Sequence, residues 1–145
     1  MASVHDWSPK RPELSLLRTV APSLLFSVRW DEDDNFLWDG EGPDPREEGY
    51  IPHDVTVVAE AIVNGELREG KAYLGGVYEK FGKRDPDIHG YLLQMLYDAL
   101  KDLMPELPSA LLSEAREAGK HLKELMRKSY EAQRLRHERS EYGEA

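Results

Sequence analysis

The sequence predicts an α+β fold in which an antiparallel four-stranded meander sheet packs against two long C-terminal helices, with a short N-terminal helix. Three observations predict it. Apolar residues alternate with period two in the first half of the chain, an Asn64-Gly65 pair marks a tight turn there, and apolar residues recur at helical spacing from residue 88 onward. A run of strands followed by a run of helices is typical of α+β domains.

The first predicted element is a short helix that starts at Pro12 and ends before Pro22, because proline is tolerated at the first helical position. Residues 23–30 alternate between apolar and polar side chains, which predicts a strand with one buried face. Residues 31–35 then form a turn, and Phe36 to Trp38 is predicted to return as a short second strand.

Residues 40–52 are rich in glycine, proline and acidic side chains, which favours an irregular surface loop. The next two strands are predicted at 55–63 and 67–78, joined by a hairpin at Asn64-Gly65, since both residues tolerate positive φ. Three glycines in the last strand predict a bulge or a bend: Gly70, Gly75 and Gly76.

Two long helices are predicted in the C-terminal part of the chain. The first starts at Asp85-Pro86 and runs to Pro105, and the second starts near Ser109. The apolar stripe of the second helix fades beyond Tyr130. We therefore expect a single α+β domain over residues 1–135 and a polar, frayed tail over residues 136–145.

Length and composition limit the kind of protein. A chain of 145 residues, 40% of them hydrophobic, is long enough for one independent core. The chain has no cysteine, which excludes disulfide frameworks and thiolate metal sites. Because no apolar run approaches the roughly 18 residues of a membrane span, we expect a soluble, cytoplasmic protein that does not contact membranes.

Negative charge is concentrated between Asp31 and Gly49, which we call the acidic segment. It holds nine of the 28 carboxylates of the chain, opposed only by Arg46, and so carries minus eight of a net charge of minus nine. Such crowding costs free energy that a basic partner or a cation relieves. Apolar side chains lie in the same stretch, with Phe36 and Trp38 expected on one strand face.

Motifs for metal and cofactor chemistry are weak. Asp31, Asp33 and Asn35 match the first ligands of an EF-hand loop, but Phe36 stands where its glycine is required and Gly42 where its glutamate is required. Phosphate-binding and nucleophile-elbow motifs are missing from the sequence, so no cofactor is expected. The five histidines are interpreted as surface or structural residues, and we expect His89 to pair locally.

The preferred functional hypothesis is a non-catalytic acidic module that binds a basic surface of a partner protein. Carboxylates would steer the partner at long range, and aromatic side chains would form the contact centre. Small inhibitors and regulators of nucleic-acid machinery, of the kind that phages encode against RNA polymerase or nucleases, use such surfaces, although no motif here identifies a family. The predicted partner-binding residues are Asp31, Glu32, Asp33, Asp34, Phe36, Trp38, Asp39, Glu41, Asp44, Glu47 and Glu48.

Two alternatives remain open at this point. The same acids would serve a metal-dependent hydrolase if they converged in a concave site. The last helix would pair two copies into a structural homodimer through the stripe of Leu111, Ala115, Ala118, Leu122 and Leu125. The basic end of that helix would otherwise dock on the acidic segment itself or contact a partner, and direct nucleic-acid binding is not expected because the net charge opposes it.

Overall fold

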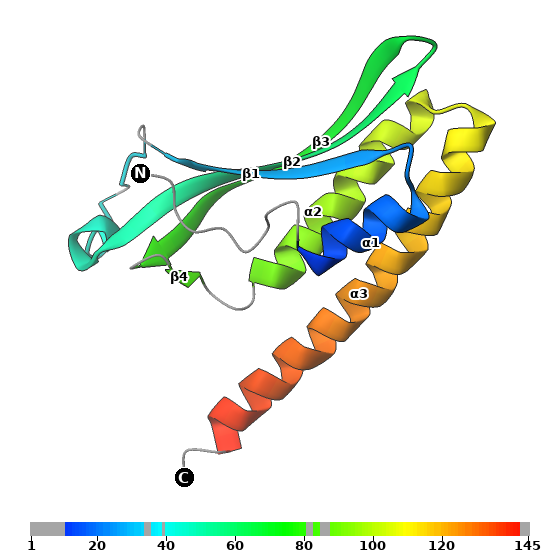
Figure 1. The fold of residues 1–145 in the computed structure, drawn as a ribbon. Coiled ribbons are helices and arrows are strands. Elements are labelled where there is room, and N and C mark those ends of the chain that lie inside the picture. The colour runs from blue at the N-terminus through cyan, green and yellow to red at the C-terminus, as the bar shows by residue number, and fades with distance from the viewer. Residues whose placement is uncertain (1–10, 34–35, 39, 81–82, 85–87, 143–145) are drawn as a thin grey trace.

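The chain folds as an α+β protein with an antiparallel sheet and three helices, as the computed structural model shows (Figure 1). The structure describes residues 11–33, 36–38, 40–80, 83–84 and 88–142. The helices are α1 (Pro12–Val20), α2 (Ile88–Leu103) and α3 (Ser109–Tyr142), and short 3-10 helices η1 (Pro45–Glu48) and η2 (Met104–Glu106) join longer elements. The strands are β1 (Leu25–Glu32), β2 (Tyr50–Val63), β3 (Glu66–Lys80) and β4 (Lys83–Arg84).

The strands follow one another in the sheet in the order β1-β2-β3-β4, all antiparallel. Three are long, and β4 adds only two residues at the edge beside the end of β3. The predicted hairpin is confirmed: Asn64 and Gly65 both have positive φ (53° and 79°), and Val63 pairs with Glu66. Two consecutive positive φ values match the type I′ turn, whose twist suits a hairpin.

The predicted strand at Phe36–Trp38 is wrong, because these residues have no strand conformation. Strand β2 begins at Tyr50, earlier than predicted, and its first residues pair with the end of β1, where Glu32 lies opposite His53. This pairing occupies the place beside β1 that the predicted strand would need. The early start of β2 was not predicted because Pro52 lies within it and proline is disfavoured in strands. The Pro52 carbonyl oxygen nevertheless accepts a hydrogen bond from the Asp33 N–H (3.0 Å).

All three helices lie on one side of the sheet: α1 and α2 pack against the strands, and α3 packs against α1 and α2 (Figure 1). Alternate residues of β2 point into the core, and α2 contributes a continuous set of fully buried leucines. The buried residues of these two elements include Val55, Val57, Ala59, Ala61, Leu92, Leu93, Leu96, Leu100 and Leu103. No helix of the described residues lies on the opposite face, which we call the open sheet face.

A bulge at Gly75-Gly76 changes which residues face the core. Between His53 and Val55 the pairing of β2 with β3 shifts by one residue, and Gly76 has a φ of +68°. The extra residue reverses the alternation that follows it. Tyr78 therefore lies on the open sheet face, whereas Glu79 points inward and is almost fully buried. The bulge was predicted from the glycines, but this reversal was not.

Helix α2 packs very closely on β3 at Gly70. A Cβ atom at this position would overlap the carbonyl oxygen of Ala99 and lie 2.5 Å from the amide nitrogen of Leu103. Next to it, the Lys71 N–H on the outer edge of β3 donates to the Asp102 carboxylate (3.0 Å). Helix α2 therefore shields this edge of the sheet, which limits strand pairing with other chains.

A polar chain joins the three helices. Glu13 on α1 accepts from Arg11 Nε (2.7 Å) and contacts His89 Nε2 (3.2 Å), and His89 Nδ1 lies 3.3 Å from Ser129 Oγ on α3. Burial raises the pKa of Glu13, but hydrogen bonds from its backbone and from His89, with the charge of Arg11, outweigh it and leave the pKa below its ordinary value. His89 thus pairs across helices, and the expected local pair stays a prediction because Asp85 and Asp87 at the helix start lie outside the described residues.

The second half of α3 extends past the other helices (Figure 1). The helix continues through Tyr142, and from Arg134 to Arg139 its side chains are exposed. The predicted boundary between a domain at 1–135 and a tail at 136–145 stays a prediction. The predicted helix start at Asp85 and Pro86 lies outside the described residues. Within the described ranges, no helix is both long and apolar enough to cross a bilayer.

Candidate functional site: the acidic segment

The acidic segment connects β1 to β2 at one end of the sheet. Asp31 and Glu32 are the last residues of β1, the chain then forms a loop with η1, and Gly49 precedes β2. Two of the predicted partner-binding residues, Asp34 and Asp39, lie outside the described residues. The others are brought together around η1 and the end of β1.

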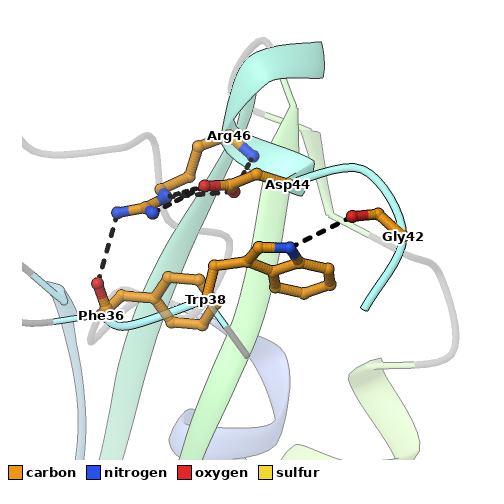
Figure 2. A network of polar contacts seen from close by, with 5 residues as sticks. All are labelled: Phe36, Trp38, Gly42, Asp44 and Arg46. Atoms are coloured by element: carbon orange, nitrogen blue, oxygen red, sulfur yellow. Dashed lines mark hydrogen bonds and ion pairs between the residues drawn. The ribbon is translucent and has the colours of Figure 1, made fainter. Parts of the chain in front are cut away.

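The loop is held together by contacts within itself (Figure 2). The Asp44 carboxylate accepts from the Arg46 backbone N–H (2.9 Å) and caps η1, which Pro45 begins. The same carboxylate forms an ion pair with the Arg46 guanidinium (2.6 Å), and this hydrogen bonding holds the pKa of Asp44 below its ordinary value. Arg46 also donates to the Phe36 carbonyl oxygen (3.3 Å), and the Trp38 indole donates to the Gly42 carbonyl oxygen (3.2 Å).

Phe36 attaches the loop to the open sheet face. Its ring packs edge-on against Tyr78, with centroids 5.9 Å apart, and the Tyr50 ring also packs edge-on against Tyr78, at 6.3 Å. The Arg46 guanidinium lies 5.1 Å from the Phe36 centroid, within the range of a cation–π contact. Phe36 is therefore a structural anchor of the loop.

The expectation that Phe36 and Trp38 lie on one strand face is wrong, because residues 36–38 form no strand. Both side chains are half-buried and tied into the loop, Phe36 by ring packing and Trp38 by its indole hydrogen bond. Leu37 between them is 89% exposed and is the apolar side chain that the loop presents to solvent. Sequence reasoning missed this residue because the contact that fixes Phe36 joins it to Tyr78, far along the chain.

The negative charge of the segment is largely uncompensated. Arg46, its only cation, is committed to Asp44, and Asp31 pairs with Arg29 of β1 (2.8 Å). Three further carboxylates are exposed and take part in none of the ion pairs that join described residues: Glu32, Glu47 and Glu48. Close like charges of this kind repel one another, so binding a cationic surface is favourable.

The acidic surface continues onto the open sheet face at Asp54. This residue lies directly opposite Asp31 in the sheet, an arrangement of like charges that destabilises a strand pair. Its carboxylate accepts a hydrogen bond from the Tyr73 hydroxyl (2.8 Å), which raises the pKa of Tyr73. Asp54 was not among the predicted partner-binding residues.

An open depression of about 460 Å³ lies beside η1. Glu32 and Asp33 line it together with Arg46, Tyr50 and Ile51, so two carboxylates, a guanidinium and an aromatic ring surround the same space. In the part of the chain that the structure describes, no group of three or more His, Asp or Glu side chains is arranged to hold a metal ion.

Two buried ionisable residues lie at the same end of the sheet, on its covered face. His53 on β2 is almost fully buried, with Nδ1 3.0 Å from the Ile51 carbonyl oxygen, and Glu79 lies on the neighbouring strand. The alternation that places Val55 in the core extends back to His53 and would have indicated its burial. No comparable signal exists for Glu79, because its orientation depends on the bulge.

Part of the α3 stripe that the homodimer hypothesis uses is buried within the protomer, and the homodimer itself stays a prediction. Three residues of the proposed stripe, Ala115, Ala118 and Leu122, are fully buried inside the protomer. The basic residues that follow pair within α3, Arg127 with Glu124 (2.6 Å) and Arg134 with Glu131 (3.0 Å). Among the described residues, no ion pair joins this end of α3 to the acidic segment.

Comparisons of the chain with protein-family models, with curated proteins and with solved structures find no match.

Proposed function

We propose that the chain is a non-catalytic binding module whose acidic segment docks on a basic surface of a partner protein. The observation that carries the proposal is the set of exposed carboxylates around a loop that is already folded, with its one cation neutralised by Asp44. A preformed loop loses little conformational entropy on binding. The exposed carboxylates attract a cationic surface at long range and raise the association rate.

Leu37 supplies the apolar contact at the centre of this surface. It is the most exposed large hydrophobic residue among those described, and the acids flank it on both sides in the sequence. A desolvated apolar contact inside a charged rim is the usual arrangement of a protein interface. Phe36 and Trp38 support Leu37 from within the loop and contribute indirectly.

The partner class that fits is a protein whose surface normally contacts nucleic acid. Such a surface is rich in lysine and arginine because it neutralises phosphates. A dense group of carboxylates on a small domain presents a similar pattern of negative charge. On this proposal the chain acts as an inhibitor or regulator of nucleic-acid machinery, such as an RNA polymerase or a nuclease.

Affinity capture from a lysate of the native cell, with the chain immobilised, tests the proposal. The informative variant is Glu32→Gln/Glu47→Gln/Glu48→Gln, which removes three exposed charges outside any described ion pair. A matched control, Glu117→Gln/Glu124→Gln/Glu138→Gln on α3, changes the net charge equally. Captured proteins should be basic and should be lost as salt approaches about 1 M, where the Debye length is about 3 Å.

The acidic-segment variant, Leu37→Ala and the α3 control should differ in how they bind the captured protein. The acidic-segment variant should slow association, Leu37→Ala should speed dissociation, and the α3 control should change neither. An association that survives the acidic-segment variant but is lost in the α3 control would contradict the proposal. Magnesium or manganese at millimolar concentration should leave the melting temperature unchanged, whereas a hydrolase that binds metal through these acids would be stabilised.

A further inference from the structure

Strand β1 forms one edge of the sheet, because β2 is its only neighbour in the strand order of the described residues (Figure 1). Its register with β2 is continuous from Leu25 to Glu32, without a bulge. An edge strand presents a row of backbone N–H and C=O groups to which another strand can add. The strand leads directly into the acidic segment, so its outer edge adjoins the proposed docking surface.

The hydrogen bond that follows β1 shows which of its backbone groups face outward. The Asp33 N–H donates to the Pro52 carbonyl oxygen of β2 (3.0 Å). Because the direction of the backbone groups alternates along an antiparallel strand, the odd-numbered residues of β1 bond to β2 and the even-numbered residues face outward. Within the described ranges, the outward N–H and C=O groups of Phe26 and Val28 have no backbone hydrogen-bond partner.

Solvent reaches this edge at Val28. The Val28 side chain points to the covered face of the sheet and is only partly buried, whereas Val57, directly opposite on β2, is fully buried. The helices thus cover the central strand but leave β1 partly open. Phe26 is nearly buried (6%), and Asp31 and Glu32 are exposed, so the accessible part of the edge lies between Val28 and the acidic segment.

The opposite edge of the sheet, on β3, is protected in three ways. The Lys71 N–H bonds to the Asp102 carboxylate, the bulge interrupts the regular pairing, and β4 pairs with the last residues of β3. Proteins use devices of this kind against strand addition. Strand β1 has no bulge and contains neither proline nor lysine, and the ion pair of Arg29 with Asp31 lies on the open sheet face. Strand addition is therefore favoured at β1.

We infer that the outer edge of β1 binds an extended, cationic segment of the partner, which adds to the sheet as a further antiparallel strand. The inference rests on the proposed function and extends it to the form of the ligand. Only an extended chain matches the alternating spacing of the outward N–H and C=O groups, and antiparallel pairing is the more stable kind. Charge complementarity favours a cationic segment over a second copy of this chain, whose net charge of minus nine opposes its approach.

The side chains of β1 set the sequence pattern that fits the edge. In an antiparallel pair, residues directly opposite each other point to the same face. An apolar residue opposite Val28 covers the exposed part of that side chain. A lysine or arginine opposite Glu32 meets a carboxylate that joins none of the ion pairs between described residues. Arg29 and Asp31 neutralise each other on the other face, so the fitting pattern is Lys-x-x-x-Val.

Peptides of about seven residues, built from threonine with one lysine and one valine, test the inference, because threonine favours an extended chain. In the matched peptide the lysine precedes the valine by four positions. In the control peptide of identical composition it precedes the valine by three, which places the two side chains on opposite faces. Binding to the full chain is measured by fluorescence anisotropy. The matched peptide should bind about fivefold more tightly, the effect of one cross-strand charge pair.

Methylation of single peptide amides tests whether the backbone carries the contact. In the proposed register the valine amide of the matched peptide faces β1, and the amide of the next residue faces away. Methylating the valine nitrogen should weaken binding by about tenfold, because a hydrogen bond is lost and the methyl group blocks the approach. Methylating the next nitrogen should leave the affinity unchanged, and equal losses would exclude strand addition.

Hydrogen exchange, followed for each residue by NMR, locates the peptide on the chain. In the free chain the Val28 amide should exchange faster than the amides of Ser27 and Arg29, because only the odd-numbered residue amides bond to β2. Saturating matched peptide should slow exchange at Val28 by at least about tenfold and leave the other two unchanged. Val28→Pro removes the outward N–H without breaking a bond to β2 and should weaken binding by at least about fivefold, whereas Val28→Thr keeps it and should bind about as the wild type does. The urea midpoint confirms that each variant is folded.

The outcomes separate this inference from the proposed function. If Glu32→Gln/Glu47→Gln/Glu48→Gln slows association of the captured protein, but the bound protein leaves Val28 exchange unchanged, the proposed function stands and strand addition is excluded. If the free chain sediments as a dimer in which Val28 is already protected, the edge belongs to a second copy and the inference is overturned. Equal binding of the matched and control peptides also overturns it. If the captured protein protects Val28 but the acidic-segment variant leaves its association unchanged, the proposed function alone is contradicted.

Discussion

Replacing Gly70 with alanine should destabilise the fold strongly, because α2 leaves no space for a side chain. The added Cβ would overlap the Ala99 carbonyl oxygen and lie 2.9 Å from the Leu103 Cβ. These are mostly backbone atoms of a helix, which cannot move aside singly, so overpacking should cost about 3 kcal/mol, the upper end of its usual range. Displacing α2 also weakens the hydrogen bond from Lys71 to Asp102, worth about 1 kcal/mol, whereas the strand gains about 0.5–1 kcal/mol from losing a glycine.

The net loss of about 3 kcal/mol is measurable by urea denaturation. With a slope of about 1.5 kcal/mol per molar, the midpoint should fall by about 2 M. Gly119→Ala on α3 is the matched control, since its Cβ would lie in ordinary contact with Tyr97 (3.7 Å) and Leu100 (3.8 Å). That control should gain up to about 1 kcal/mol from helix propensity. An unchanged midpoint for Gly70→Ala would refute the close packing of α2 on β3.

Three further predictions concern the helices and the loop. Glu13 has a pKa below its ordinary value of 4.5, so its charge stabilises the fold above pH 4.5, and this contribution is lost as pH falls through the folded pKa. In denaturation at a series of acidic pH values, the free energy of unfolding should fall less steeply with pH for Glu13→Gln than for the wild type. An identical slope would argue against the interhelical contact. Leu122→Ala should lower the free energy of unfolding by about 2–5 kcal/mol without changing the sedimentation coefficient, because Leu122 is buried within the protomer. A wild-type dimer that this variant dissociates would contradict the placement of Leu122 in the protomer core. Arg46→Gln should speed limited proteolysis between residues 36 and 46, because it removes the hydrogen bond to the Phe36 carbonyl oxygen. The control Arg29→Gln, whose ion pair lies on β1, should leave the cleavage rate unchanged. Equal cleavage rates for the two variants would mean that Arg46 does not hold the loop.

Much of the fold was predictable because its signals are local. Pro12 marks the start of α1, Asn64-Gly65 forms the hairpin, and the apolar spacing after residue 88 gives α2 and α3. Each of these depends on neighbouring residues in the chain, whose preferences are expressed directly in the structure.

The errors arise where distant residues decide the outcome. The pairing of β1 with the start of β2 excludes a strand at 36–38, and Pro52 obscured that start. The direction of Tyr78 and Glu79 depends on a single extra residue at the bulge, which reverses all later alternation. The stripe of α3 matched helix pairing between two copies equally well, and only the packing around Leu122 shows that it is used inside the protomer.

The candidate site was predictable in its charge but not in its contacts. The crowding of acids from Asp31 to Glu48 is visible in the sequence, and so is the isolation of Arg46 among them. Which apolar residue faces solvent is not visible, because Phe36 turns toward Tyr78 and leaves Leu37 exposed. The contribution of Asp54 depends on strand register, which composition does not indicate.

Hydroxyl-radical footprinting of the chain, alone and with the protein that it captures, tests the docking surface most directly. The method reports the oxidation of individual side chains, so the two faces of the molecule serve as controls for each other. Binding should protect Leu37 and Tyr73 and leave Tyr91 and Tyr130 as reactive as in the free chain. Protection confined to Tyr91 and Tyr130, with Leu37 unchanged, would place the partner on the helices and contradict the account.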